Sequence, residues 1–493
     1  MKSNLYLYNS LSRKKELFFS INPPFVGMYL CGPTVYGDPH LGHARPAICF
    51  DVLFRHLKYL GYRVRYVRNI TDVGHLVDDA DAGEDKIGQK AKIEQLEPME
   101  VAQYYTDRYH QFIDKLNVLR PSIEPRASGH IPEQITLVKQ ILDNGFAYVS
   151  NGSVYLDVPK YAQYYSYGML SGREIDELLS GTRELAGGDE KRHPSDFALW
   201  KRAEPEHLMR WESPWSLGFP GWHIECTAMS TKYLGSPFDI HAGGMDLLFP
   251  HHEAEIAQAN AYTHPHSPTQ EANFWLHCNM ITIDGKKMGK SLGNFITLAE
   301  FYSGQHRLLS QSFSPQTIRF FMLQAHYRGT LDFSNEALIA AEKALKRIQN
   351  AWKSLFSLPC SAYSTIKPQI LAENILTALN DDLNTAVAIA HIFEAVSWIH
   401  AIQQGTETIT ADDLQALQAV FDTFLSGILG VELEIHNELS KKPLQAAMEL
   451  LIEMRQQARL GKDFKTADAI RDKLRAAGIL LKDSNTETSW ELL

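Results

Sequence analysis

The first 70 residues switch between strand-like and helix-like spacing of their apolar positions. Residues 25–30 form a short apolar run, residues 41–60 repeat apolar side chains at helical spacing, and residues 63–70 alternate as a strand does. Turn-forming residues separate the first two segments, and Gly61 follows the helical one. Strand, loop, helix and strand in this order predict a βαβ unit of a parallel sheet, with the loop at the carboxyl edge where such sheets bind ligands.

The pattern downstream predicts an insertion into this sheet and then a helical region. Residues 120–202 contain a helical stretch at 133–142 and a hairpin signal at 150–152. Strand and helix alternation resumes over residues 221–279. After residue 333 helical spacing dominates, over residues 335–355, 370–404 and 410–429. We therefore expect an α/β domain followed by a helical bundle.

The composition is that of a folded protein with several domains. The chain has 493 residues, of which 44% are hydrophobic and 22% charged, and this length exceeds that of one typical domain. No apolar run approaches the roughly 20 residues that span a bilayer, and charged residues at 13–16 interrupt any N-terminal signal core. We therefore expect a cytoplasmic protein with no membrane partner.

The charge distribution bears on the class of partner. With a net charge of -10, the chain can bind a nucleic acid only through a locally basic face. Residues 455–482 hold eight basic and three acidic side chains, which is such a face. A solvated pair of helices has the same composition, so charge alone does not decide between the two interpretations.

Two short motifs contain the groups that polyphosphate chemistry needs. Residues 40–43, His-Leu-Gly-His, stand where the predicted loop enters the helix, so that backbone N–H groups, the helix dipole and two imidazoles can face a phosphate. Residues 286–291, Lys-Lys-Met-Gly-Lys-Ser, put ammonium groups on a glycine-containing loop that can follow a moving polyphosphate. Surface histidines and a solvated basic turn explain either motif alone at least as well. Their order and separation together indicate a nucleotide site.

A third set of residues is suited to a soft metal ion. The five cysteines are odd in number and far apart, which makes a poor disulfide framework but leaves room for a metal site. Cys31 ends the first predicted strand, Cys226 lies in a second motif, and His251 and Glu255 are one turn apart on a predicted helix. Two thiolates, an imidazole and a carboxylate are a plausible Zn²⁺ set. Two buried core cysteines beside an unrelated helix face are the alternative.

At these motifs the chain resembles the class I aminoacyl-tRNA synthetases, whose signatures are a His-x-Gly-His motif and a Lys-Met-Ser-Lys-Ser loop. Within that class it is similar to the cysteinyl-tRNA synthetase family over essentially its whole length. Besides the zinc candidates, the segments that carry the likeness are residues 30–36, 69–72, 196–201, 211–215, 249–253, 381–385 and 458–471. Three positions depart from the family pattern: Gly289 replaces a Ser, Phe219 stands where an Arg is common, and residues 72–86 are longer than usual.

The resemblance implies an overall fold and a reaction. The fold is α/β, with a Rossmann-like parallel-sheet catalytic domain, an inserted connective domain, an α-helical bundle and a small C-terminal anticodon-binding domain. In the reaction, L-cysteine and ATP with Mg²⁺ form cysteinyl-adenylate, and the cysteine passes to the 3′-terminal adenosine of tRNA(Cys). One Zn²⁺ per chain, held by Cys31, Cys226, His251 and Glu255, takes the substrate thiolate as a further ligand. Because a serine hydroxyl stays protonated and hard, we expect no separate editing activity.

The resemblance also implies roles for individual residues. The expected catalytic residues are His40, His43, Lys287 and Lys290. Those expected at ATP are Gly42, Gly243, Asp246, Met288 and Lys290. Those expected around the amino acid are Gly32, Thr34, Thr71 and Trp222, although Trp222 is equally typical of a core aromatic. We expect the protein to be a monomer.

Pattern and resemblance together predict six segments. They are residues 1–119 and 203–279 for the two halves of the catalytic domain, 120–202 for the connective insertion, 280–333 for a stem-contact region with the Lys-Met-Gly-Lys-Ser loop, 334–432 for the helical bundle, and 433–493 for the anticodon-binding domain.

Two other functions remain open at this point. One is a ligase that activates cysteine in the same fold and joins it to an amino sugar, but such relatives lack the anticodon module. The other is a non-catalytic tRNA-binding protein with a structural zinc, which would not need both phosphate motifs.

Overall fold

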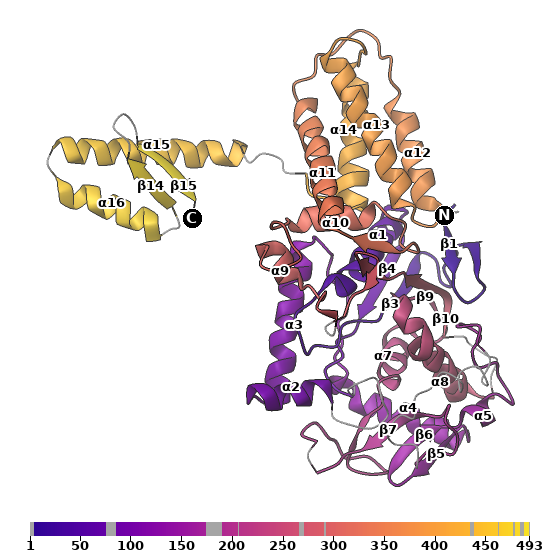
Figure 1. Ribbon diagram of the computed structural model, residues 1–493. Helices are drawn as coiled ribbons and strands as arrows, with labels where there is room; N and C mark the ends of the chain where they lie inside the picture. The colour runs from indigo at the N-terminus through magenta and orange to yellow at the C-terminus, as the bar shows by residue number, and fades with distance from the viewer. Residues whose placement is uncertain are drawn as a thin grey trace. The chain divides into compact units, whose positions relative to one another are not determined.

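The predicted βαβ unit is present and forms part of a four-stranded parallel sheet. In the computed structural model (Figure 1), β3 (Phe25–Leu30), α1 (Leu41–Tyr59) and β4 (Arg63–Arg68) follow one another as expected. β9 (Phe238–Gly244) and β10 (Ala272–Cys278) complete a sheet of order β10-β9-β3-β4, in which every pairing is parallel. The two halves of this sheet are far apart in sequence, because most of the chain before residue 238 intervenes between β4 and β9.

The chain divides into two units, Met1–Glu432 and Leu433–Leu493, and each is described by itself. The structure describes residues 4–74, 85–173, 190–205, 207–265, 271–289, 292–433, 438–461, 463–476, 479–483 and 488–492. The predicted site residue Lys290 lies outside these ranges.

The parallel sheet is buried on both faces. On one face Met28 and Leu30 of β3 pack with Phe50 of α1. On the other face Tyr29 packs with Trp275 and with residues of α7 (Ile224–Leu234) and α8 (Glu253–Thr263). A strand covered on both faces needs apolar side chains at successive positions, which explains why β3 is a continuous apolar run.

The predicted insertion contributes three strands to an antiparallel sheet of order β5-β6-β7-β8, whose last strand lies beyond the predicted boundary at residue 202. Its strands are β5 (Ala147–Ser150), β6 (Ser153–Leu156), β7 (Phe197–Arg202) and β8 (Gly218–Pro220). The hairpin expected at residues 150–152 is confirmed, because Asn151 and Gly152 have the positive φ angles, 49° and 83°, of a two-residue turn. The predicted helix at 133–142 lies within α4 (Ile131–Asp143), which packs against α7 and α8 beneath the catalytic sheet.

The remaining elements of the first unit surround the two sheets. Before the insertion are β1 (Tyr6–Asn9), β2 (Lys14–Leu17), α2 (Lys86–Glu94) and α3 (Pro98–Lys115). Within the insertion are η2 (Ser128–His130) and α5 (Val158–Tyr161). After β9 come η4 (Met245–Leu247) and the π-helical turn η5 (Leu248–His252). After the sheet come β11 (Ile281–Ile283), β12 (Lys286–Lys287), α9 (Leu298–Ser303), α10 (Pro315–Leu323) and β13 (Leu331–Phe333).

The helical bundle is present, but one predicted helix is two. The bundle consists of α11 (Asn335–Leu355), α12 (Pro368–Asn380), α13 (Thr385–Gln403), α14 (Ala411–Val420) and the π-helical continuation η7 (Phe421–Ile428). The expectation of one helix over 370–404 is wrong, because Asp382 and Leu383 adopt positive φ angles of 60° and 53°. The turn buries the Asp382 carboxylate, which accepts hydrogen bonds from the Tyr8 amide and the Tyr327 hydroxyl.

The apolar character of α13 has a structural explanation. Among the described residues it is the one helix long and apolar enough to cross a membrane by length and composition, contrary to the expectation that no such run occurs. It packs against α11 and α12 in the bundle, where residues such as Ile392 and Ile399 are fully buried. Core helices of globular proteins have this composition, so the pattern is accounted for by packing.

The second unit pairs two helices with a hairpin. α15 (Glu438–Leu460) and α16 (Phe464–Ala476) are followed by β14 (Ile479–Asp483) and β15 (Thr488–Leu492), which pair antiparallel with Leu481 opposite Trp490. The sequence pattern after residue 333 indicated helices almost throughout, so this hairpin was not predicted. Its strands have five residues each, and neither alternates strictly between apolar and polar positions.

A buried arginine, Arg319, connects α1 of the sheet domain to the end of the bundle. Arg319 of α10 is fully buried, contacts the Asp51 carboxylate of α1 at 2.5 Å, and donates from Nε to the Leu429 carbonyl at 2.7 Å. Replacing Arg319 with Met should lower the free energy of unfolding by about 3 kcal/mol, because the Asp51 charge loses its fully buried partner and keeps only Arg55.

Urea denaturation measures this effect. The matched control is Arg120→Met, which breaks the exposed Arg120–Asp114 pair and should cost about 0.5 kcal/mol. Equal destabilisation by the two substitutions would show that the buried pair has no special role.

Candidate functional site

The carboxyl edge of the parallel sheet opens into a cavity of about 390 Å³. The loop after β3, the start of α1, the start of α7 and the segment around β12 all contribute to its wall. The predicted site residues that line it are Cys31, Gly32, Thr34, His40, Gly42, His43, Thr71, Trp222, Cys226, Asp246, His251, Lys287 and Met288. The structure therefore brings the histidine motif, the lysine motif and the cysteines to one cavity.

Two predicted site residues lie outside the lining of this cavity. Glu255 is fully buried behind it, with its carboxylate facing Cys31 and His251. Gly243 lies in β9, where an added Cβ would be 2.6 Å from Cε1 of His252, so the glycine makes room for that ring. Gly244 lines the cavity in its place.

The His-Leu-Gly-His motif forms the N-terminal cap of α1. Nδ1 of His40 accepts from the Gly42 amide at 3.0 Å, and the His40 amide donates to Nδ1 of His43 at 3.4 Å. The two rings are 4.0 Å apart between centroids. A side chain at position 42 would clash with the His40 ring, which explains the glycine. Desolvation lowers the pKa of His43 to about 4, so this imidazole is neutral at pH 7 and donates without carrying charge.

The lysine motif lies next to this cap. Asp284 and Gly285 turn the chain between β11 and β12, and Lys287 and Met288 then reach the cavity. Met288 is close to Gly42, because its Cε would lie 3.7 Å from a Cβ added there. The side chain of Asn294 holds the loop by accepting from the Gly289 amide at 2.8 Å and donating to the Lys287 carbonyl at 3.0 Å. This contact uses the backbone of residue 289, so it does not depend on the missing Ser hydroxyl.

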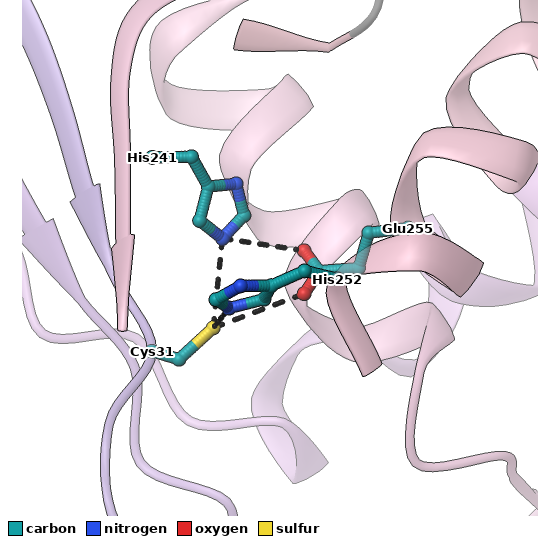
Figure 2. Close-up of side chains that lie close together, drawn as sticks. All are labelled: Cys31, His241, His252 and Glu255. Atoms are coloured by element: carbon teal, nitrogen blue, oxygen red, sulfur yellow. Dashed lines mark hydrogen bonds and ion pairs between the residues drawn. The ribbon is translucent and has the colours of Figure 1, made fainter. Parts of the chain in front are cut away.

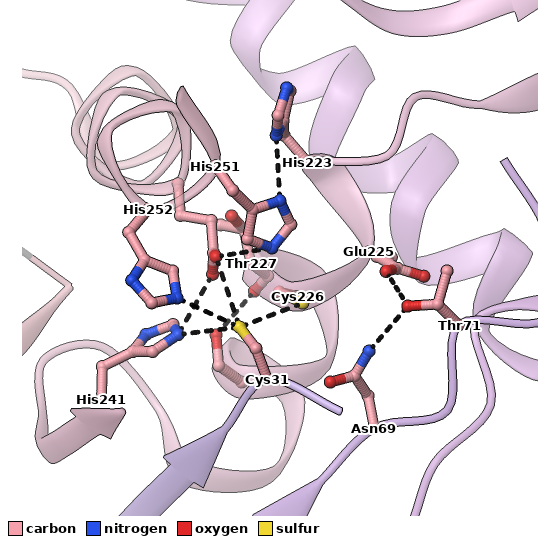
Figure 3. A network of polar contacts seen from close by, with 12 residues as sticks. Cys31, Asn69, Thr71, His223, Glu225, Cys226, Thr227, His241, His251 and His252 are labelled. Atoms are coloured by element: carbon pink, nitrogen blue, oxygen red, sulfur yellow. Dashed lines mark hydrogen bonds and ion pairs between the residues drawn. The ribbon is translucent and has the colours of Figure 1, made fainter. Parts of the chain in front are cut away.

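The four predicted zinc ligands converge. Their candidate ligand atoms all lie within 4.8 Å of one another. Sγ of Cys31 is 3.8 Å from Sγ of Cys226 (Figure 3). The same sulfur is 3.8 Å from Oε1 of Glu255, and Nε2 of His251 is 3.0 Å from that carboxylate oxygen. His251 belongs to η5 rather than to the helix predicted for it, yet its ring faces Glu255. Nδ1 of His223 lies 3.0 Å from Nδ1 of His251 and orients that imidazole.

A second set of candidate ligands shares Cys31 and Glu255 with the first. Figure 2 shows His241 and His252 facing the sulfur of Cys31, and their Nε2 atoms are 3.5 Å and 3.3 Å from it. His252 is oriented in turn by Nε2 of His277 at 2.8 Å. Sequence reasoning missed both histidines. The available signal was His241 itself, a polar residue that follows Asp239 in the largely buried strand β9.

The electrostatics of these groups favour a bound cation. Burial and neighbouring carboxylates raise the pKa of Cys31 to about 12, and burial raises the pKa values of Cys226 and Glu255 well above their ordinary range. Burial likewise lowers the pKa of His252, which keeps it neutral. Buried thiolates and carboxylates without a counter-charge are costly. A divalent ion supplies that charge and displaces the protons, so the donor set fits Zn²⁺.

A polar chain runs beside the two sulfurs. The side-chain Nδ2 of Asn69 donates to Oγ1 of Thr71 at 3.2 Å, and the Thr71 hydroxyl donates to Oε1 of Glu225 (Figure 3). Thr34 pairs with Thr71 through a backbone bridge, and Oδ1 of Asn69 accepts from the Gly32 amide at 2.8 Å. Three of the four residues predicted around the amino acid thus belong to one connected wall. The fourth, Trp222, is half-buried with its ring 4.5 Å from that of His251.

One departure from the family pattern is buried in the core cluster that also contains Cys226. Phe219 in β8 is 3% exposed and lies with its ring 5.1 Å from that of His207. It replaces a charged side chain with a packed apolar one. Residues 75–84, which make the acidic segment longer than usual, lie outside the described ranges.

Comparisons with known proteins agree with this geometry. Residues 18–343 match the family model for the tRNA synthetases class I (C) catalytic domain, residues 375–434 match the DALR domain, and residues 442–490 match the cysteinyl-tRNA ligase anticodon binding domain. Among solved structures, methionyl-tRNA synthetase of Mycobacterium tuberculosis bound by methionyl-adenylate has a TM-score of 0.57 at 13% identity and covers 82% of this chain and 92% of that one. A ternary complex of leucyl-tRNA synthetase from Agrobacterium radiobacter gives a TM-score of 0.56 at 12% identity, over 84% of this chain and 85% of that one.

The fold and the cavity that unites the two phosphate motifs define a class I aminoacyl-tRNA synthetase, an ATP-dependent ligase that acts on an amino acid and a tRNA. Cysteine–tRNA ligase of Bacteroides fragilis is 59% identical over 100% of both chains, and those of Porphyromonas gingivalis and Chlorobaculum tepidum are 57% and 46% identical over 99% or more. The chain belongs to the cysteinyl-tRNA synthetase family, as the resemblance predicted. These matches do not support the amino-sugar ligase or the non-catalytic protein.

Proposed function

We propose that this chain activates L-cysteine with ATP and Mg²⁺ and transfers it to the 3′-terminal adenosine of tRNA(Cys), with one Zn²⁺ per chain recognising the substrate sulfur. The observation that carries the proposal is the convergence of Cys31, Cys226, His251 and Glu255 at the cavity that His40, His43 and Lys287 also line. A soft-metal site and a polyphosphate site in one cavity fit a substrate that has both a thiol and a carboxylate.

The first candidate set is the better zinc site. It offers two sulfur ligands, whereas the set with His241 and His252 offers only Cys31. Soft thiolates favour zinc over the harder cations of the cell. When bound, the metal supplies a soft Lewis acid that favours a thiolate over a hydroxyl. His241 and His252 then lie behind the Cys31 sulfur and exclude water from it.

The phosphate motifs act by position and charge. As the cysteine carboxylate attacks the α-phosphate, pyrophosphate leaves and negative charge grows on the phosphate oxygens. His40 and neutral His43 donate hydrogen bonds there, and Gly42 lets the phosphate approach the helix N-terminus. Lys287 and Lys290 stabilise the departing polyphosphate. No group of the protein needs to form a covalent bond to the substrate.

The remaining roles concern binding. We assign Gly32, Thr34, Thr71 and Trp222 to the amino acid, and Gly243, Asp246 and Met288 to the adenosine. Support for the first group is its connected wall beside Cys31, and for Asp246 and Met288 their place in the cavity lining. Gly243 has an indirect role in the adenosine site, because it makes room for the His252 ring. We further propose a cytoplasmic monomer, because one chain contains both the activation site and an anticodon-binding domain.

ATP–pyrophosphate exchange tests this function. We expect exchange with L-cysteine, exchange with serine that is lower by about 10⁴-fold in kcat/KM, and close to one zinc per chain in the same sample. The selectivity should disappear together with the metal on chelation. Serine-dependent exchange comparable to that with cysteine, or exchange that survives full removal of zinc, would contradict the proposal.

A further inference from the structure

We propose that Glu225 binds the α-ammonium group of the substrate cysteine. This inference rests on the proposed function, since it takes the substrate sulfur to lie at Cys31 and Cys226. Neither the family pattern used above nor the matched signature motifs assigned a role to this glutamate. It is a specificity-determining residue for the reaction rather than a metal ligand.

The position of Glu225 is fixed by hydrogen bonds and packing. It lies in the first turn of α7, is 1% exposed, and receives the Thr71 hydroxyl at Oε1. Thr71 is itself held by Asn69, which also binds the Gly32 amide. Figure 3 shows this chain passing beside Cys31 and Cys226 and ending at the Glu225 carboxylate. The carboxylate is therefore held in one orientation before any substrate binds.

The second carboxylate oxygen has no partner in the part of the chain that the structure describes. Oε2 of Glu225 is buried and makes no hydrogen bond there, although the side chain lines the cavity. A buried acceptor without a donor is costly. A ligand that enters the cavity with an N–H donor, and above all with a positive charge, removes this cost.

Cysteine has such a donor at the required place. Its nitrogen and sulfur are separated by only two carbon atoms, so a sulfur bound between Cys31 and Cys226 puts the ammonium close to the neighbouring residue Glu225. Among the described residues that line the cavity, the only other acidic side chain is Asp246, in the turn after β9. Two successive residues of α7 thus contact different parts of the substrate. Cys226 faces the substrate sulfur, and Glu225 faces Thr71 and the substrate nitrogen.

The test compares thiols that differ by one charged group, on the zinc-loaded full-length protein. Cysteamine has the ammonium without the carboxylate, and 3-mercaptopropionate has the carboxylate without the ammonium. Glu225→Gln keeps the acceptor for Thr71 but removes the charge. We expect it to raise the Kd of L-cysteine and of cysteamine about 10- to 100-fold, as for a lost charge-assisted hydrogen bond. The Kd of 3-mercaptopropionate should be unchanged or lower. Calorimetry measures all three.

The matched control is Glu271→Gln. Glu271 is also a fully buried carboxyl that accepts from a hydroxyl, Ser230 at 2.8 Å, but it is not among the residues that line the cavity. The Glu271→Gln substitution should leave the ratio of the Kd of cysteamine to the Kd of 3-mercaptopropionate unchanged. If Glu225→Gln weakens all three thiols equally, Glu225 only supports the wall and the inference is wrong.

A measurement on the unaltered protein keeps the inference testable if Glu225→Gln loses zinc. Cysteamine and 2-mercaptoethanol differ in having an ammonium or a hydroxyl on the same two-carbon thiol. We expect cysteamine to bind at least about tenfold more tightly, and equal affinity overturns the inference. Failure of every thiol to bind, together with absence of zinc, would instead contradict the proposed function.

Discussion

Replacing Cys226 with Ser should remove both the bound zinc and the activation of cysteine. The substitution deletes one of the two sulfur atoms in the proposed ligand set, whose candidate ligand atoms lie within 4.8 Å of one another. A serine hydroxyl stays protonated and is a poor ligand for a soft ion. We expect the zinc content to fall to near zero and kcat/KM for cysteine-dependent pyrophosphate exchange to fall by about 10³-fold or more. Metal analysis and the exchange assay on one sample measure both.

The matched control for this variant is Cys278→Ser. Cys278 is also buried and lines the same cavity, but its sulfur faces Cys49 at 3.6 Å and lies in neither candidate set. It should retain zinc and exchange activity. A Cys226→Ser protein that keeps its zinc and activates cysteine normally would refute the ligand assignment and leave the set with His241 and His252 as the metal site.

Removing all residues after Glu432 should separate the two steps of the reaction. The cut falls where the first unit ends, and every described residue of the cavity belongs to that unit. Pyrophosphate exchange with cysteine should therefore stay within about twofold of the full chain. Aminoacylation should fall by about 100-fold or more in kcat/KM, because the matched anticodon-binding domain and its basic side chains are lost.

Aminoacylation measured with tRNA(Cys) at several salt concentrations makes this test sharper. The full chain should lose affinity for tRNA steeply as salt rises, since phosphate contacts release counterions, and the shortened chain should show a shallower dependence. A shortened chain that aminoacylates as well as the full one would show that residues 433–493 do not bind the tRNA. A loss of exchange activity would show that the first unit depends on the second.

The sequence could predict those parts of the fold whose pattern is local. The βαβ unit from β3 to β4, the helix α11 and the hairpin at residues 150–152 each have a periodic or turn signal within their own residues. The break between α12 and α13 falls at a cluster of turn-forming residues, 380–385, which the expectation of one continuous helix did not take into account. It exists because Asp382 turns inward to bind groups near Tyr8 and Tyr327, which are far away in the sequence.

The distinction between local sequence patterns and contacts between distant residues also applies to the candidate site. Residue types at motif positions predicted that Cys31, Cys226, His251 and Glu255 belong together, and the structure brings them together. His241 is a polar residue in a buried strand, but neither its neighbours nor those of Glu225 in the sequence indicate which groups on other elements these side chains face. Their importance comes from burial beside groups on other elements, and only the folded chain determines that burial.

The proposed metal ligands also bear on how the enzyme matures during synthesis. Cys31 and Glu255 are 224 residues apart, and they come from the two sequence-distant halves of the sheet. A ribosome-bound chain that has not yet emerged through Glu255 cannot offer the complete set, however much cation is present. We therefore expect metal binding to occur late in synthesis, when it closes a very long chain loop. A newly made chain that retains the metal has brought the two halves of the sheet together.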